Sequence, residues 1–177
     1  MRAGAAAFVA GLAALAAAPA SAQLSQPEQT IVETVEDGFE TDVALLETIT
    51  LINSGSHNHA GVKQVADALV PEFQALGFAT EWIDQSASGR AGHLFARHEG
   101  AAGTTKMLLI GHLDTVFEPD SPFTAFVRDG DTAVGPGILD DKGGIIVILS
   151  ALRAMKEAGT LDGANIVVAL TGDEEDA

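Results

Sequence analysis

The chain has 177 residues, with 25 acidic and 9 basic side chains, a net charge of −16 and no cysteine. This charge argues against binding to nucleic acid or to anionic membrane surfaces, since both would repel an acidic protein. A cation-binding protein and an ordinary acidic surface both remain compatible with it. The absence of cysteine excludes disulfide bonds, thiolate zinc ligands and a cysteine nucleophile. The length suits one domain of ordinary size.

The first 22 residues have the pattern of a signal peptide. Arg2 supplies a positive start, residues 3–18 are apolar, and Ala20-Ser21-Ala22 offers a small-residue cleavage site. The apolar stretch is short and only weakly hydrophobic for a membrane span. We therefore expect a periplasmic or secreted protein, free of the membrane after cleavage, whose remaining domain is residues 23–177. An uncleaved membrane anchor is the alternative.

Three segments have the apolar spacing of helices. Residues 28–52 form the first segment, in which Gly38 is expected to separate two helices, and residues 62–76 form the second, ending at Gly77. The third, residues 142–158, begins with two glycines.

Short apolar segments after the second and third of these helices predict strands at residues 78–83, 93–97, 106–110 and 164–170. The 106–110 segment, KMLLI, is continuously apolar after its lysine, which is typical of a strand buried on both faces. Asp129-Gly130 predicts a hairpin turn. The alternation of helices and strands indicates an α/β fold, a mixed sheet with helices on both faces.

Acidic and histidine side chains follow two of the predicted strands. His112 and Asp114 come directly after 106–110, and Glu174 and Glu175 follow 164–170. Ligands of α/β sheets bind in crevices beyond the carboxyl ends of the strands. In extended backbone Asp114 faces the same side as His112, so its carboxylate could orient the imidazole. One imidazole with several carboxylates is a ligand set for a hard or borderline metal.

Each of these motifs also has a simpler explanation. A bare pair of glutamates is usually a solvated turn. In extended backbone, adjacent residues point to opposite sides, so Glu174 and Glu175 are not expected to bind the same ion. Asp140 and Asp141 precede a helix, whose dipole favours a carboxylate there without any function. The motifs gain weight from their joint occurrence and order.

Four motifs together carry a family resemblance: SGSHNHAGV, GHLDTVF, GPGILDDKGG and TGDEE. With them the chain resembles the dinuclear zinc exopeptidases and deacylases, which include glutamate carboxypeptidase, acetylornithine deacetylase and succinyl-diaminopimelate desuccinylase. The likeness is strongest to the secreted glutamate carboxypeptidases and covers roughly residues 40–177. It implies the catalytic domain of a zinc exopeptidase, truncated before the lid domain of that family.

The resemblance assigns metal ligands residue by residue. His112 should bind one zinc ion, Asp140 should bridge two, and Glu175 should bind the other; Co²⁺ or Mn²⁺ could substitute. Glu174 should be the general base and Asp114 should orient His112. In the family the peptide bond after the bridging aspartate is commonly cis. His57, His59, His93 and His98 are not expected to bind metal.

The implied activity is hydrolysis of the amide bond of small peptides or N-acyl amino acids, with release of a C-terminal residue such as glutamate. An N-deacylase of small amino-acid derivatives and a non-catalytic metal-binding fragment are the alternatives. The family also needs a later carboxylate, a later histidine and the lid domain, through which its members often form homodimers. After Glu175 only two residues remain. We therefore expect a partial, inactive chain from an active parent, or else a natural short product without activity.

Overall fold

The computed structural model describes residues 23–176, so the predicted signal peptide lies outside the described residues. In chain order, its helices and longer strands are α1 (Gln26–Thr50), α2 (His59–Ala75), β1 (Ala79–Asp84), β2 (Gly92–His98), β3 (Lys106–His112), α3 (Gly143–Glu157) and β6 (Asn165–Thr171). Between β3 and α3, the short strands β4 (Val127–Asp129) and β5 (Thr132–Val134) form the expected hairpin.

The main sheet has the strand order β1-β2-β6-β3. β1 and β6 each pair antiparallel with β2, whereas β3 and β6 run parallel, so the predicted mixed sheet is confirmed. In the parallel register His112 lies opposite Thr171. The segments that follow these two strands therefore leave the sheet side by side, and this places the candidate ligands close together.

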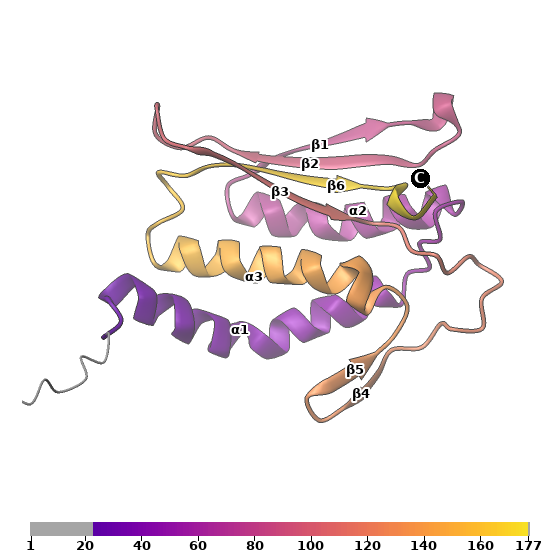
Figure 1. Cartoon of the computed structure of the whole chain (residues 1–177), viewed down its shortest axis with the longest axis horizontal. Helices are drawn as coiled ribbons and strands as arrows, with labels where there is room; N and C mark the ends of the chain where they lie inside the picture. The colour runs from indigo at the N-terminus through magenta and orange to yellow at the C-terminus, as the bar shows by residue number, and fades with distance from the viewer. Residues whose placement is uncertain (1–22, 177) are drawn as a thin grey trace, which may run out of the picture.

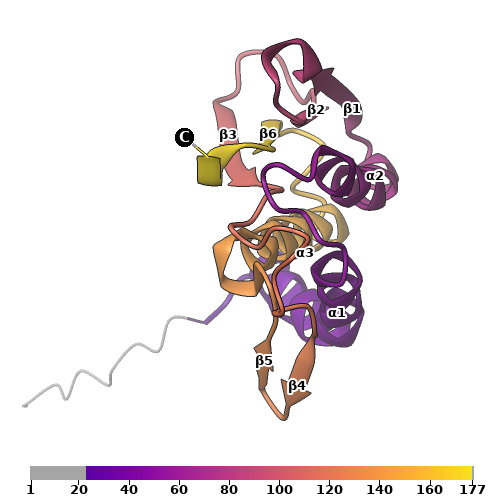
Figure 2. The same cartoon turned by 90° about the vertical axis from the view of Figure 1, so that its right-hand side faces the viewer.

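The three long helices lie on one side of the sheet (Figure 1). α2 packs beneath β1 and β2, α3 packs beneath β3, and α1 forms an outer layer against α3 (Figure 2). Alternate strand residues such as Leu94, Val168 and Leu170 point into the core between sheet and helices, where they are at most 1% exposed. No helix among residues 23–176 combines the length and apolar character that a membrane crossing requires.

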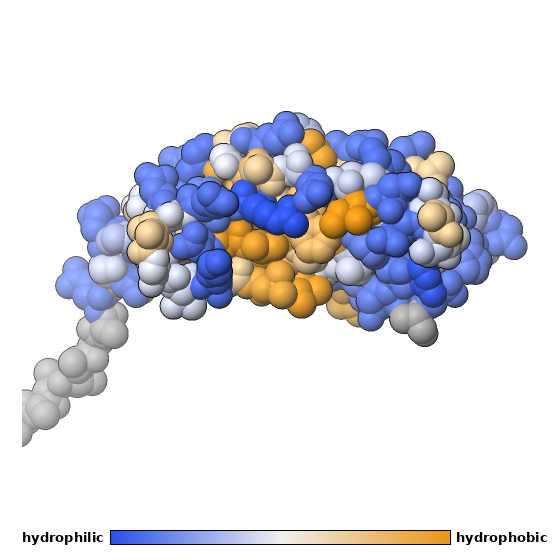
Figure 3. Space-filling view, turned by 90° about the horizontal axis from the view of Figure 1, so that it is seen from above, coloured by the Kyte–Doolittle hydropathy of each residue, from blue (hydrophilic) through white to orange (hydrophobic). Residues whose placement is uncertain are grey.

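The other face of the sheet is open in the described part of the chain, although helices were expected on both faces. Figure 3 looks onto this face and shows apolar side chains gathered across it. Leu108 and Ile110 of β3 are 58% and 67% exposed. The prediction that KMLLI is buried on both faces is wrong, because no element among residues 23–176 covers the outer face of β3 and only alternate residues such as Leu109 face the core.

The expected break at Gly38 is also wrong, since α1 is one helix of 25 residues. A glycine inside a helix costs only about 1 kcal/mol relative to alanine, and packing of α1 along α3 outweighs that cost. Arg153 of α3 joins the three helices, because its guanidinium is paired with Asp42 of α1 and, at 2.7 Å, with Glu72 of α2.

Candidate metal centre

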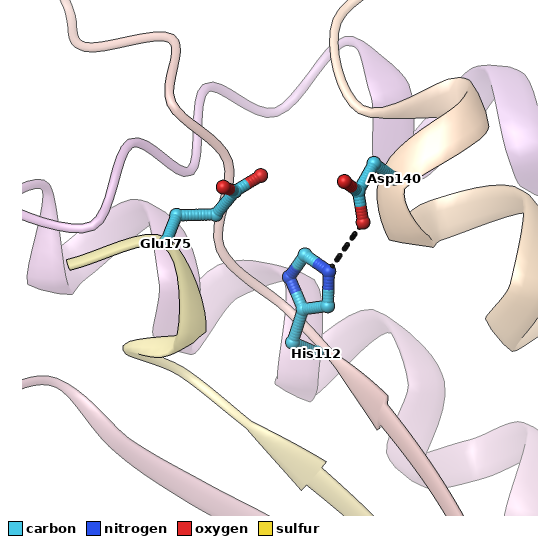
Figure 4. Close-up of side chains that lie close together, drawn as sticks. All are labelled: His112, Asp140 and Glu175. Carbon is cyan, nitrogen blue, oxygen red and sulfur yellow. Dashed lines mark hydrogen bonds and ion pairs between the residues drawn. The ribbon is translucent and has the colours of Figure 1, made fainter. Parts of the chain in front are cut away.

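Three potential metal ligands from distant parts of the chain converge at the carboxyl ends of β3 and β6 (Figure 4). His112 ends β3, Asp140 lies in the turn that leads into α3, and Glu175 follows β6. One ligand atom from each lies within 4.8 Å of the others. An imidazole and two carboxylates at this spacing suit a single Zn²⁺ ion or a similar divalent cation. The donor set therefore fits the metal that the family resemblance implies.

His112 is held at both ring nitrogens. Nε2 lies 2.8 Å from Oδ1 of Asp140, and Nδ1 lies 3.1 Å from the backbone oxygen and 3.4 Å from Oδ1 of Asp114. Burial by itself would lower the pKa of His112, but the interactions with Asp114 and Asp140 outweigh it and raise the pKa to about 9. The ring therefore carries a proton at neutral pH in the metal-free chain, which a metal ion would have to displace.

Asp114 is fully buried and accepts three hydrogen bonds from two distant segments of the chain. Oδ2 accepts the hydroxyl of Ser56 at 2.7 Å and the amide of Glu175 at 3.0 Å, and Oδ1 accepts the amide of Glu174 at 3.1 Å. Burial would raise the pKa of Asp114, but the bonds with His112, Ser56 and the two amides lower it. Asp114 thus contacts His112, as the sequence predicts, and also anchors the turn that carries both glutamates.

The turn Ile138–Lys142 presents Asp140 and turns Asp141 inward. The peptide bond between these two aspartates is cis, as the family resemblance implies. A Cβ atom on Gly111 or on Gly144 would collide with the carboxylate of Asp141, so both glycines make room for this side chain. Burial raises the pKa of Asp141. Gly144, the second glycine at the start of α3, therefore leaves the space that the Asp141 carboxylate occupies.

Lys142 is the next residue and is completely buried. Its Nζ donates a hydrogen bond of 2.9 Å to the carbonyl of Ile52, just beyond the end of α1. Burial lowers its pKa to about 8. This hydrogen bond links the turn Ile138–Lys142 to the segment just after α1. The sequence pattern does not predict it.

Glu174 and Glu175 lie in a helical turn, Glu174–Asp176, and not in the extended backbone that the sequence interpretation assumed. Burial, followed by the charge of nearby Asp140, raises the pKa of Glu175. At the far end of the turn Arg90 donates hydrogen bonds to the backbone oxygen of Asp176, at 3.2 and 3.3 Å. The proposed base and the proposed ligand therefore sit on a turn that is held at both ends.

A cavity of about 340 Å³ opens beside the carboxylates of Asp140 and Glu175. Its other walls are mostly apolar, and they include Val116, Phe117, Phe123 and Leu139. Another hollow, of about 360 Å³, lies at the opposite end of β3 beside His98 and Lys106, away from the acidic cluster. The smaller cavity is the one that places a bound molecule next to the candidate ligands.

The remaining histidines lie outside the three-ligand cluster. His57 is exposed, and His98 bonds the carbonyl of Ala164 and stacks near Phe78. His93 lies beside Asp173, with its Nδ1 3.9 Å from a carboxylate oxygen. His59 begins α2. Within residues 23–176 none of these four joins His112, Asp140 and Glu175 as a ligand group.

Residues 108–177, which contain all three potential ligands, match the sequence profile of peptidase family M20/M25/M40. The chain carries a peptidase M20 family domain. Carboxypeptidase G2 of Pseudomonas sp. (strain RS-16) is 30% identical to this M20 chain over 168 residues, covering 94% of the chain and 40% of that protein. Succinyl-diaminopimelate desuccinylase of Gluconacetobacter diazotrophicus is 34% identical over 113 residues, covering 60% of the chain and 29% of that protein.

Among solved structures, the dipeptidase Dug1p of Saccharomyces cerevisiae superposes on this M20 chain with a TM-score of 0.72 at 18% identity. The match covers 83% of the chain and 35% of Dug1p, and it supports the fold alone. The M20 chain thus spans well under half the length of these relatives. The fold and the family resemblance predicted from the motifs are both confirmed.

Proposed function

We propose that this M20 domain belongs to a metal-dependent hydrolase that cleaves the amide bond of a small peptide or N-acyl amino acid. The observation that carries the proposal is the convergence of His112, Asp140 and Glu175 within 4.8 Å at one edge of the sheet. The fold of the sheet brings these positions together, but it does not require that all three carry side chains able to bind a metal. Zn²⁺ is the ion that suits this donor set best, with Co²⁺ or Mn²⁺ as substitutes and two ions as the expected number.

A bound zinc ion would polarise the scissile carbonyl and lower the pKa of an attacking water. The chain's own residues would then position the substrate and move protons. Glu174 is the proposed general base: it takes a proton from the attacking water and later delivers it to the departing amine. Asp114 keeps the His112 ring oriented, and its carboxylate accepts hydrogen bonds from the amides of Glu174 and Glu175.

For the substrate, we propose release of a C-terminal amino acid such as glutamate. The similarity to carboxypeptidase G2 over 94% of the chain supports a carboxypeptidase activity. A second candidate, removal of an N-acyl group from a small amino-acid derivative, is supported by the 34% identity to the desuccinylase. Both activities use the same metal chemistry and differ in which side of the amide bond is recognised.

The proposal is tested by measuring zinc content and the hydrolysis of dipeptides, N-acyl-glutamates and N-succinyl amines. The 177-residue chain and the product of the gene's complete reading frame are assayed in parallel. In whichever product is active, Glu174→Gln should lower kcat by about 100-fold or more with its zinc retained. Asp176→Asn, which removes a charge from the same turn, should leave kcat nearly unchanged. Full activity of the Glu174→Gln variant would refute the assignment of the base.

We further propose that the protein is exported to the periplasm or the medium by its first 22 residues. The charged start, apolar stretch and small-residue site of this segment support export. Mass spectrometry of protein recovered from cell fractions should give an N-terminus at Gln23. An intact Met1 in a cytoplasmic fraction would contradict export, and an intact Met1 in the membrane fraction would favour the anchor.

A further inference from the structure

Ser56 lies in the loop between α1 and α2 and contacts the candidate metal centre through Asp114. It is 7% exposed, and its hydroxyl donates a 2.7 Å hydrogen bond to Oδ2 of Asp114, which is fully buried. A hydrogen bond to a buried carboxylate is among the stronger ones in a protein. Ser56 is therefore placed to control the orientation of this carboxylate.

The orientation of Asp114 in turn determines where the acidic turn lies. Its Oδ2, which accepts the Ser56 hydroxyl, also accepts the amide of Glu175, while Oδ1 accepts the amide of Glu174. Oδ1 also lies 3.4 Å from Nδ1 of His112. Without the Ser56 hydroxyl one of the hydrogen bonds that fix this carboxylate is lost, so we expect it to rotate and its bonds to the two amides to lengthen.

The backbone around Ser56 is fixed independently of the side chain. Gly55 forms a parallel bridge with Thr115, the Ser56 amide donates to the Thr115 carbonyl at 3.2 Å, and the Thr115 amide donates to the Ser54 carbonyl at 2.9 Å. A Cβ atom on Gly55 would collide with Glu118, so the two segments lie in close contact. The Ser56 hydroxyl therefore projects from a rigid support.

We propose that Ser56 is a positioning residue of the metal centre. Through Asp114 it holds the Glu174–Glu175 turn at the distance from His112 and Asp140 that metal binding needs. It touches neither the proposed metal nor the substrate. This role rests on the metal centre described under the proposed function.

The chain offers a matched control two residues away. Ser54 is fully buried in the same loop, but its hydroxyl has no hydrogen-bond partner among the described residues. Ser56→Ala and Ser54→Ala thus remove the same atom from the same loop, and only the first change breaks a bond to Asp114. Ser56→Thr keeps the hydroxyl and serves as the conservative rescue.

The first readout is the dissociation constant for Zn²⁺, measured for each variant by competition with a chromophoric chelator. Removing a hydrogen-bond partner behind a metal ligand typically weakens metal affinity by about 10- to 100-fold, and we expect at least about tenfold for Ser56→Ala. Ser56→Thr and Ser54→Ala should stay within about threefold of the parent chain. An equal loss in Ser54→Ala and Ser56→Ala, or no recovery in Ser56→Thr, would overturn the proposal.

The second readout needs no metal and separates this inference from the proposed function. Amide hydrogen exchange of Glu174 and Glu175 is measured in the metal-free chain, with amides of β6 as internal references for global unfolding. Ser56→Ala should accelerate exchange at the two glutamates and leave the β6 amides unchanged. A parent chain that binds no zinc while Ser56→Ala still shows this acceleration would refute zinc binding by these 177 residues but retain the positioning of the turn. Unchanged exchange at both glutamates would refute the positioning role itself.

Discussion

Nε2 of His112 lies 2.8 Å from Oδ1 of Asp140, so two candidate ligands of one ion are hydrogen-bonded to each other in the metal-free chain. The proton on the His112 ring is stabilised by its carboxylate neighbours. Burial alone would favour the neutral ring, but Asp114 and Asp140 raise the pKa of His112 to about 9. Since a histidine binds metal only as the neutral imidazole, metal and proton compete for this nitrogen.

This competition predicts that metal affinity depends on pH. Below pH 9 one proton leaves His112 for each ion bound at this site, so the apparent association constant should rise about tenfold per pH unit between pH 7 and pH 8.5. Above about pH 9 it should level off. Isothermal titration calorimetry in buffers of different ionisation enthalpy would count the released proton directly. An affinity that does not change across this range, with no proton released, would exclude His112 as a ligand with a raised pKa.

The same shift predicts how the stability of the metal-free chain varies with pH. The pKa of His112 is about 9 in the folded chain and about 6.5 in the unfolded chain. Its contribution is therefore fully present below pH 6.5 and is lost as the pH rises through 9. The shift corresponds to at most about 3 kcal/mol. Urea unfolding in the presence of a chelator should show this loss in the parent chain.

Comparison with His112→Gln isolates that contribution from other titrating groups. The difference in unfolding free energy between the parent and the variant should be largest at pH 6 and should shrink between pH 6.5 and 9. A difference that is constant across this window would mean that the protonated ring is not preferentially stabilised by its carboxylate neighbours.

Glu175 should matter for metal binding far more than for stability. Glu175→Gln keeps the shape of the side chain but removes the ligand charge, so zinc affinity should fall by more than about 100-fold. Because burial and Asp140 already raise the pKa of Glu175, the metal-free variant should be as stable as the parent within about 1 kcal/mol. Asp176→Asn, in the same turn, should retain zinc affinity. Equal losses in both variants would indicate a general electrostatic effect and not a ligand.

The meeting of the ligands could be predicted from sequence because it follows from local rules. Each apolar strand is recognisable, and the polar residues directly after it must lie at its carboxyl end. The parallel register that sets His112 opposite Thr171 then brings the two ends together. The role of Asp140 was predicted only from the family resemblance. Asp140 lies in a turn that contains a cis peptide bond, and an apolar pattern does not indicate such a turn.

The environment of β3 could not be predicted in the same way. A run such as KMLLI indicates a strand, but its burial depends on which elements cover it, and the sequence of the strand itself does not contain that information. Similarly, Ser56 and Lys142 contribute through contacts with partners 58 and 90 residues away. Single hydrogen bonds over such separations leave no periodic pattern.

The one-sided burial of β3 predicts opposite outcomes for neighbouring residues. Ile110 is 67% exposed, so Ile110→Thr should change the free energy of unfolding by less than about 0.5 kcal/mol. Leu109 packs against the core, and Leu109→Ala should cost about 2 kcal/mol. Urea unfolding of the two variants decides the matter. A cost above about 1.5 kcal/mol for Ile110→Thr would mean that this face of the sheet is covered in solution.

The buried ammonium of Lys142 leads to the opposite pH dependence from that of His112. Its pKa is about 8 in the folded chain against an ordinary value of 10.5, because burial disfavours the charge. The charged form therefore destabilises the fold below pH 8, and this cost disappears as the pH rises toward 10.5. The single hydrogen bond to the Ile52 carbonyl offsets only part of the cost.

Lys142→Met, which nearly conserves volume, should therefore raise the unfolding free energy at pH 7 by about 1 kcal/mol. Its advantage over the parent chain should vanish by pH 10. Lys142→Ala, which leaves a cavity, should cost about 2 kcal/mol or more at pH 7. A Lys142→Met chain that is markedly less stable at pH 7 would show that the hydrogen bond to the Ile52 carbonyl stabilises the fold by more than the burial of the charge costs.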